Sequence, residues 1–408
     1  MSTLLFTNLA QVVTCERPDA ACVYRRAAVA VERGRILEVG DADELTGRYE
    51  RAERVNCGGG VLTPGFIDSH THAVFGGWRA AEYALRSRGV PYMEIARRGG
   101  GINASIRDVR SMSEEQLAGL AVPRLEQLLD YGTTTVEIKS GYGLSPEAEL
   151  KQLRVARMLA DATPLDIVRT FLGAHEFPPG YRERREDYVA LLIQEMIPAV
   201  ARQGLATFCD VFCEPGVFTP AQARRILVAG REHGLIPKLH ADELENSGGA
   251  ELAAELEAAS ADHLGAISSA GIAALAAARG TVATLLPGTL LFLGKRTYAP
   301  ARRLLDAGAT VALATDFNPG SAPTPNLPLI LTLACSQMGM DPIEALFAAT
   351  AAGARALRLP GGDGTIAGGA PADLVLWDLE DYCEIPYRFG SAPVRGVWKR
   401  GTRVRPCL

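Results

Sequence analysis

The sequence lacks the cysteine patterns of small secreted proteins. It has only eight cysteines in 408 residues, without a CxxC pair or a dense cluster, so neither a disulfide framework nor a cysteine-rich metal site is indicated. Cys209 and Cys213 stand four apart in TFCDVFC, and the simplest interpretation is two thiols buried on one face of a strand. Such usage is typical of a reduced, cytoplasmic protein.

Basic clusters and long apolar runs are missing as well. The formal net charge is −5 and no run of Lys or Arg occurs, which gives no support to binding of nucleic acid or anionic membranes. The longest apolar runs are strand-sized, too short to cross a bilayer. Because the first residues, MSTLLFTNLAQVVT, show neither a basic leader nor a cleavable apolar core, we do not expect secretion.

What is present is the composition of a globular protein with a large core, 48% hydrophobic and 22% charged. The two ends of the chain resemble each other, since both are rich in short β-type segments: 3–14, 27–40, 371–378 and 394–405. We therefore predict a small composite β-sandwich domain built from residues 1–62 and 362–408.

Between these ends, residues 63–361 alternate between apolar runs and helix-period segments. The predicted strands are 61–68, 133–139, 165–172, 207–213, 236–240, 259–263, 281–286 and 310–316, of which 259–263 has the weakest β character. Most are continuously apolar, as parallel strands covered on both faces are. Ser113 with Gln116, and Thr219 with Gln222, have the spacing of capping boxes. The pattern predicts an α/β fold, a (β/α)8 TIM barrel, whose chemistry lies at the carboxyl ends of the strands.

The histidines fall where such a barrel would use them. Five of the six, together with one aspartate, stand at or just after the ends of predicted strands: His70, His72, His175, His240, His263 and Asp316. The sixth, His233, is predicted at a helix C-terminus, where an imidazole suits the negative end of the dipole.

His70 and His72 stand two apart, so that in an extended chain their side chains point to the same side. With His240 and Asp316 across the rim they offer three imidazoles and one carboxylate. Such a set suits Zn²⁺ or Fe²⁺/Fe³⁺ rather than Ca²⁺ or Mg²⁺. A cation held in this way lowers the pKa of a bound water to about 7 and supplies hydroxide at neutral pH.

This order of ligands resembles the metal-dependent amidohydrolase superfamily, whose members often carry a composite β-domain. Over essentially the whole chain the sequence is also similar to the amidohydrolases that open the imidazolone ring in histidine degradation. The motifs that carry this similarity are HTHAVFGGWR (70–79), GGGI (99–102), KSGYGL (139–144), LGAHE (172–176), HADE (240–243), LPGT (286–289) and ATDFNPGS (314–321).

The resemblance implies hydrolysis of the cyclic amide of 4-imidazolone-5-propanoate to N-formimidoyl-L-glutamate, with one metal ion on His70, His72, His240 and Asp316. Asp316 would also move a proton from the attacking water to the departing ring nitrogen. His263 would orient the water or polarise the carbonyl, and Glu243 would contact the ring. How acid and base roles divide among Asp316, His263 and Glu243 stays open.

The anionic tail of this substrate calls for a guanidinium, whose fork matches a carboxylate. Arg79 in GGWR matches the family's carboxylate-binding position. By the same resemblance, the other residues expected to contact the substrate are Tyr142, His175, Glu243, Asn318, Gly320 and Ser321.

Lys139 and Glu214 bear on how many metal ions are bound. Binuclear amidohydrolases often use a carboxylated lysine late in strand four, but here that strand ends in Cys213-Glu214 without one. We therefore predict one metal ion, with Lys139 structural. The resemblance also implies a homodimer.

Two alternatives remain: a metal-dependent deaminase of a heterocyclic base, and a non-catalytic scaffold of the same fold. The choice between zinc and iron is open, as is whether the loop from Glu82 to Ile102 moves over the site.

Overall fold

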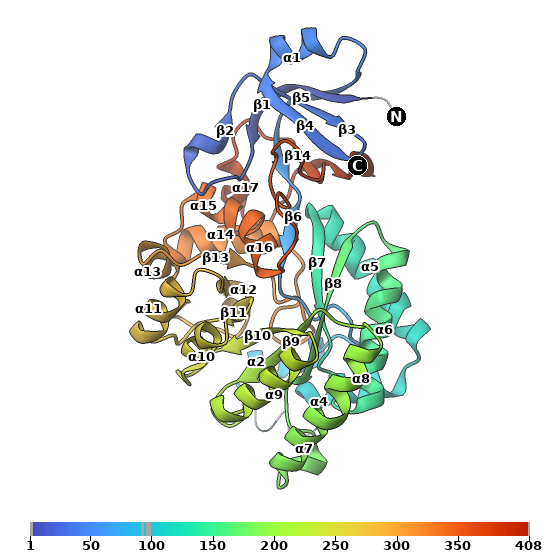
Figure 1. Cartoon of the computed structure of the whole chain (residues 1–408), viewed down its shortest axis with the longest axis vertical. Helices are drawn as coiled ribbons and strands as arrows, with labels where there is room; N and C mark the ends of the chain where they lie inside the picture. The colour runs from blue at the N-terminus through green and yellow to red at the C-terminus, as the bar shows by residue number, and fades with distance from the viewer. Residues whose placement is uncertain (1–2, 91–93, 95–98, 407–408) are drawn as a thin grey trace.

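The computed structural model describes residues 3–90, 94 and 99–406. Its strands form two separate eight-stranded sheets (Figure 1). One sheet is made from the two ends of the chain, and the other from the residues between them.

The central sheet is a barrel of parallel strands, each next to its neighbour in sequence. They are β6 (Phe66–Asp68), β7 (Thr133–Lys139), β8 (Asp166–Ala174), β9 (Phe208–Cys213), β10 (Ile236–Ala241), β11 (Ser260–His263), β12 (Val282–Leu285) and β13 (Val311–Leu313). Every residue of β7 is buried, as expected for a parallel strand covered on both faces. The predicted (β/α)8 barrel is confirmed.

The barrel closes along a seam between its first and last strands. Thr71 and Phe317 form a parallel bridge. The amide of Asp316 donates to the carbonyl of His70 at 3.0 Å, and the amide of His72 donates to the carbonyl of Phe317 at 2.9 Å. Residues 70–72 and 316–317 are thus held side by side by the backbone.

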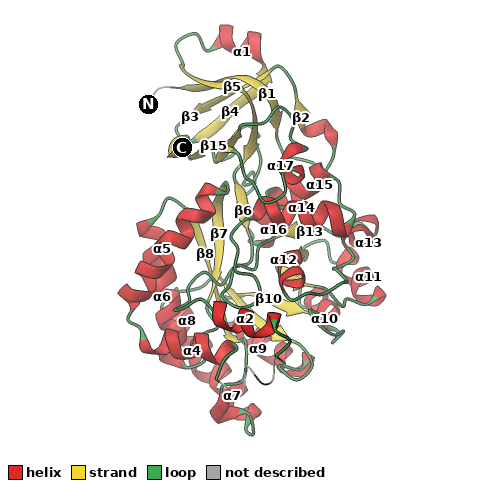
Figure 2. Ribbon diagram, turned by 180° about the vertical axis from the view of Figure 1, so that it is seen from behind, coloured by secondary structure: helices red, strands yellow, loops and turns green. Residues whose placement is uncertain are grey.

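Helices surround the barrel, and in Figure 2 α5 and α6 cover β7 and β8. Along the chain they are α2 (Ala80–Ser87), α4 (Ile102–Ser111), α5 (Glu114–Asp130), α6 (Pro146–Ala162), η2 (Pro179–Tyr181), α7 (Arg185–Leu191), η3 (Leu192–Met196), α8 (Ile197–Arg202), α9 (Pro220–Glu232), α10 (Gly249–Glu255), α11 (Ser269–Ala277), α12 (Pro287–Phe292), α13 (Ala301–Asp306), α14 (Leu327–Met338), α15 (Pro342–Ala348) and α16 (Ala351–Ala356).

Both predicted capping boxes are present, at Ser113 and Thr219, and His233 caps the C-terminus of α9 as predicted. None of the helices within the described ranges combines the length and the apolar character needed to cross a bilayer.

The second sheet joins the chain ends, in the order β16-β15-β14-β5-β1-β3-β4, with β2 beside β1. Its strands are β1 (Leu4–Val13), β2 (Val23–Tyr24), β3 (Ala27–Glu32), β4 (Arg35–Asp41), β5 (Glu53–Pro64), β14 (Leu374–Trp377), β15 (Val394–Lys399) and β16 (Thr402–Pro406); the short helices η1 (Ala20–Cys22), α1 (Ala42–Arg48) and α17 (Glu384–Tyr387) accompany them. Two strands, β14 and β5, lie between Phe6 on β1 and Trp398 on β15 in this order, yet the two ring centroids are 5.1 Å apart. The sheet therefore curls over its own core. The domain limits at 62/63 and 361/362 stay a prediction.

Two local predictions need correction. Residues 61–68 were predicted as one strand but belong to two, because β5 ends at Pro64 in the terminal sheet and β6 begins at Phe66 in the barrel. Gly65 marks the change of sheet, where an added Cβ would lie 2.2 Å from Oγ1 of Thr134. The stretch from Glu82 to Ile102 begins as helix α2 rather than as a loop, and residues 91–93 and 95–98 of it lie outside the described residues.

Candidate active site

A cavity of about 530 Å³ opens at the carboxyl ends of the barrel strands. The predicted site residues that line it are His72, Arg79, Tyr142, His175, His240, Glu243, His263, Asp316, Asn318, Gly320 and Ser321. His70 does not line it but lies fully buried beside it. The barrel thus gathers side chains that are far apart in sequence, as the strand-end pattern predicted.

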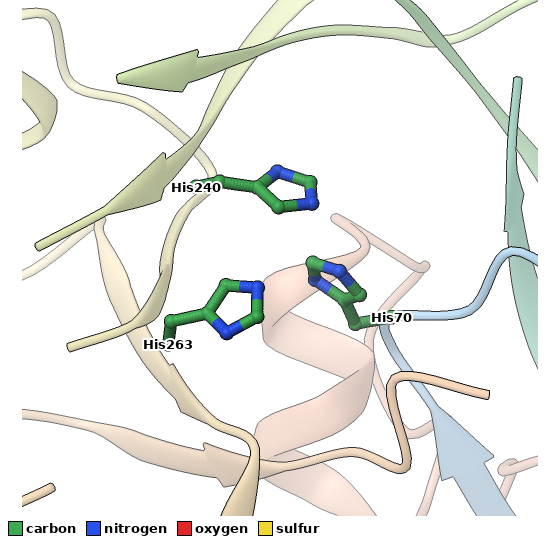
Figure 3. Close-up of side chains that lie close together, drawn as sticks. All are labelled: His70, His240 and His263. Atoms are coloured by element: carbon green, nitrogen blue, oxygen red, sulfur yellow. The ribbon is translucent and has the colours of Figure 1, made fainter. Parts of the chain in front are cut away.

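Three imidazoles close to this cavity face one another (Figure 3). His240 comes from β10, His263 ends β11, and His70 follows β6. The ring centroid of His70 lies 4.5 Å from that of His240 and 5.3 Å from that of His263. One nitrogen of each of the three rings lies within 4.8 Å of the others.

Asp316 lies against His70 and His72. Its Oδ1 is 3.6 Å from Nε2 of His70 and 3.5 Å from Nε2 of His72, while its Oδ2 accepts a 2.6 Å hydrogen bond from the hydroxyl of Thr289. The backbone of Asp316 has a left-handed φ of 54° and that of His263 a φ of 78°. Such strain in non-glycine residues is typical of functional sites.

The four predicted metal ligands do not form one compact group. His70, His72 and Asp316 have ligand atoms within 4.8 Å of one another, whereas His240 shares such groups with His70 and His263, and with His72 and His175. Within the described chain, buried Nε2 atoms of His70 and His240 have no hydrogen-bond partner. Since buried polar atoms are normally paired, these donors fit a bound transition-metal ion.

Carboxylates behind the imidazoles fix their orientation. Oδ2 of Asp262 is 2.6 Å from Nδ1 of His70, and Oδ2 of Asp210 is 3.1 Å from Nδ1 of His240, though not aligned as a hydrogen bond. A carboxylate at Nδ1 directs Nε2 toward a metal ion.

Burial sets the protonation of the histidines. Desolvation lowers the pKa of His70, His72 and His263 well below the usual value, and lowers that of His175 to about 3. All four rings are therefore neutral at pH 7, the form that binds metal.

Burial has the opposite effect on the two carboxyl groups of the cavity. Desolvation, followed by the nearby Asp316 charge, raises the pKa of Glu243 to about 8, and desolvation raises that of Asp316 to about 6. Glu243 is then protonated at neutral pH and can donate a hydrogen bond to a ligand.

Arg79 also lines the cavity, and its side chain is only 16% exposed. Its Nε donates to Oε2 of Glu82 at 3.0 Å, and Oε2 of Glu82 is also 3.0 Å from its Nη2. A Cβ added to Gly320 would lie 2.2 Å from Nη1 of Arg79, so a side chain at this position would displace the guanidinium.

The loop that follows β13 is held by Asn318. Its Oδ1 accepts from the amides of Gly320 and Ser321, both at 2.8 Å, and its Nδ2 donates to the carbonyl of Asp316 at 2.6 Å. Asn318, predicted as a substrate contact, therefore also shapes the loop that carries Gly320 and Ser321, the other two predicted contacts of this loop.

Lys139 and Glu214 contact neighbouring side chains and backbone. Nζ of Lys139 lies 2.8 Å from carboxylate oxygens of both Glu137 and Asp210. Glu214 accepts hydrogen bonds from the amides of Glu243, Leu244 and Glu245, which fixes the loop that presents Glu243.

Six further residues line the cavity and were missed from the sequence: Arg86, Ile102, Phe212, Leu244, Leu293 and Lys295. Arg86 stands seven residues after Arg79, two helical turns along the same face of α2, and this spacing could have revealed it. Lys295 follows α12 in a stretch without a comparable signal.

The sequence comparisons with known proteins agree on one family. A model described as "Amidohydrolase family" matches residues 61–404. The imidazolonepropionase of Geobacillus kaustophilus (strain HTA426) is 49% identical over 403 residues, covering 98% of this chain and 94% of the relative. That of Myxococcus xanthus (strain DK1622) is 48% identical over 406 residues, covering 98% and 96%.

Solved structures share the fold. A zinc-bound adenosine deaminase from Xanthomonas campestris superposes with a TM-score of 0.74 at 22% identity, covering 99% of this chain and 93% of that one. The ochratoxinase of A. niger does so with a TM-score of 0.72 at 18% identity, covering 100% and 96%.

Proposed function

This chain belongs to the amidohydrolase family and, within it, to the imidazolonepropionases, and we propose that the cavity at the barrel mouth is where it performs their reaction. It is a hydrolase of histidine degradation, which opens 4-imidazolone-5-propanoate with water to give N-formimidoyl-L-glutamate. The observation that carries this conclusion is near-half identity along almost the full length of both chains. The gathering of one set of histidines, carboxyls and an arginine at a single cavity supports it.

The metal ion of this family would be held by His70, His72, His240 and Asp316, one ion per chain. Their donor set accepts both Zn²⁺ and Fe²⁺/Fe³⁺, so availability in the cell decides between them. When bound, the ion supplies an acidic water and polarises the carbonyl of the cyclic amide.

Asp316 carries the proton. Its Oδ1 faces His70 and His72, while Thr289 holds the other oxygen and fixes the plane of the carboxylate. We assign to Asp316 the removal of a proton from the attacking water and its delivery to the ring nitrogen that leaves.

His263 and Glu243 bind the ring. Nε2 of His263 is buried without a hydrogen-bond partner in the described chain and lies 3.8 Å from Oε2 of Glu243. Neutral His263 is assigned to orient the water and the carbonyl, and protonated Glu243 to bind the ring through its nitrogen or oxygen atoms.

Arg79 binds the propanoate tail. Glu82 takes one edge of its guanidinium, which leaves Nη1, beside Gly320, for the tail carboxylate. Tyr142, His175, Asn318, Gly320 and Ser321 complete the substrate contacts. The cations that line the cavity, Arg79, Arg86 and Lys295, favour an anionic substrate over the neutral base of a deaminase.

The direct test is turnover of 4-imidazolone-5-propanoate, followed by its loss of absorbance, with the purified protein loaded with zinc or ferrous iron. We expect turnover that disappears on removal of the metal by a chelator and returns on its readdition. A fully loaded protein that leaves the imidazolone unchanged would refute the proposed function.

We also propose that the chain acts as a homodimer in the cytoplasm. The dimer rests on the family resemblance, and light scattering of the purified protein tests it. A reducing compartment agrees with the cysteines, since all that lie within the described residues carry free thiols.

A further inference from the structure

A second group of potential metal ligands lies next to His70. Ligand atoms of His70, Glu137 and Asp262 come within 4.8 Å of one another, and all three residues are buried. Asp210 adjoins them, fully buried as well. The barrel interior therefore places three carboxylates next to the histidine cluster.

Two lysines lie among these carboxylates, both fully buried. Nζ of Lys139 is 2.8 Å from Oε2 of Glu137, 2.8 Å from Oδ2 of Asp210 and 3.6 Å from Oδ2 of Asp262. Nζ of Lys238 is 2.9 Å from Oε1 of Glu137 and donates to the carbonyl of Ser69 at 3.1 Å. Buried charges are tolerated only when paired in this way.

Lys139 is the lysine that joins the carboxylates behind two different histidines. Asp262 is 2.6 Å from Nδ1 of His70, and Asp210 is 3.1 Å from Nδ1 of His240. Oδ2 of Asp210 faces both Nδ1 of His240 and the ammonium of Lys139. In the same way, Oδ2 of Asp262 faces both Nδ1 of His70 and this ammonium. The ammonium of Lys139 thus contacts both carboxylates that lie behind predicted metal ligands.

We propose that Lys139 is a positioning residue whose ammonium acts as a fixed internal cation, filling a second cation position formed by Glu137, Asp210 and Asp262 and thereby limiting the chain to one metal ion. The inference rests on the metal site of the proposed function. Three carboxylates face two ammonium groups here, so loss of Lys139 leaves one ammonium against three negative charges. In a buried site such an excess draws a divalent cation.

The test is the metal content of the Lys139→Ala variant, which removes the charge and opens space for an ion. Wild type and variant are equilibrated with excess zinc, freed of loosely bound ions by gel filtration, and analysed by plasma mass spectrometry. We expect one zinc per wild-type chain and two per Lys139→Ala chain. One zinc in the variant, bound with wild-type affinity, would overturn the inference.

Lys399→Ala is a matched control. Lys399 is also largely buried, 8% exposed, and pairs with carboxylates of Asp166 and Asp373, but no histidine is among these partners. It should keep one zinc. If it also gains a second ion, the extra zinc reflects any lost buried lysine, and the specific role of Lys139 is refuted.

A wild-type measurement guards against a variant that fails to fold. Anomalous scattering from wild-type crystals soaked in excess zinc should show an ion at His70 and Asp316 and none among Glu137, Asp210 and Asp262. An ion among these carboxylates beside an intact Lys139 would refute the inference. Failure of the proposed function is separate, because it is a loss of imidazolone turnover at unchanged metal stoichiometry.

Discussion

Oδ2 of Asp262 lies 2.6 Å from Nδ1 of His70, and both side chains are fully buried. The neutral His70 ring therefore donates its Nδ1 proton to this carboxylate and keeps a lone pair on Nε2. Asp262, rather than the ion itself, therefore orients His70 for binding a metal ion.

Replacing Asp262 with Asn should weaken metal binding without removing a ligand. An amide in place of the carboxylate is a poorer acceptor for Nδ1–H, and such losses behind a ligand typically cost 10–100-fold in metal affinity. Competition with a chromophoric chelator measures the zinc Kd, and circular dichroism checks the fold. An unchanged Kd would show that Asp262 does not orient His70.

Asp316→Asn should lower kcat by about 10²–10⁴-fold, the usual contribution of general acid–base catalysis. The amide keeps the shape of the side chain and some metal, but it cannot accept the proton. Rates are compared at measured metal content, with Asp306→Asn, an exposed aspartate at the end of α13, as the control. Near-normal turnover of Asp316→Asn contradicts the assigned role.

Arg79→Met should raise KM for the imidazolone far more than it lowers kcat. The charge-assisted contact to the tail is worth roughly 1.5–3 kcal/mol, which corresponds to about a 10–100-fold loss of kcat/KM. Arg88→Met, an exposed arginine that caps the same helix, should leave both constants unchanged. An unaltered KM in Arg79→Met would place the tail elsewhere.

Glu243 should make the metal-free protein less stable as pH rises. Burial raises its pKa from 4.5 to about 8 in the native state, so between these values the folded chain keeps a proton that the unfolded chain has lost. Its contribution to the free energy of unfolding is complete below pH 4.5 and is lost as pH rises through 8, by up to about 1.4 kcal/mol per pH unit.

Urea unfolding at pH 5, 6, 7 and 8 checks this dependence. Glu243→Gln should give a flatter profile than wild type, while Glu232→Gln, at an exposed position of α9, should follow wild type. Parallel profiles for all three proteins would contradict a raised pKa at Glu243.

The barrel was predictable because the alternation of strand-like and helix-like segments along the sequence is clear. Largely apolar runs such as 281–286 mark buried parallel strands, and β12 occupies Val282–Leu285. Even the weakly apolar 259–263 was predicted as a strand, and β11 occupies Ser260–His263. The run 61–68 was misread because an apolar stretch does not show where a chain passes from one sheet to another. Only the Pro64-Gly65 pair hinted at the break.

The site residues at the ends of strands were predictable, whereas the contacts of side chains inside the barrel were less so. The distance between His240 and Asp316, and the pairing of Arg79 with Glu82, depend on packing that no spacing encodes. The buried charges offered a partial signal: Glu137 stands two before Lys139, and Lys238 two before His240, so that each pair shares a strand face. A charged residue in a buried strand indicates an ion pair inside the barrel, but the sequence does not identify the partner.

The seam between residues 70–72 and 316–317 has a consequence for biosynthesis. These segments are separated by nearly the whole barrel in the chain, so the metal position is assembled only when the last strand docks against the first. An ion that binds there favours the closed ring over open intermediates, because binding free energy reserved for the native state adds to its stability. The ion then stabilises the closed barrel in addition to taking part in the reaction, and nascent chains that lack the eighth strand are inactive.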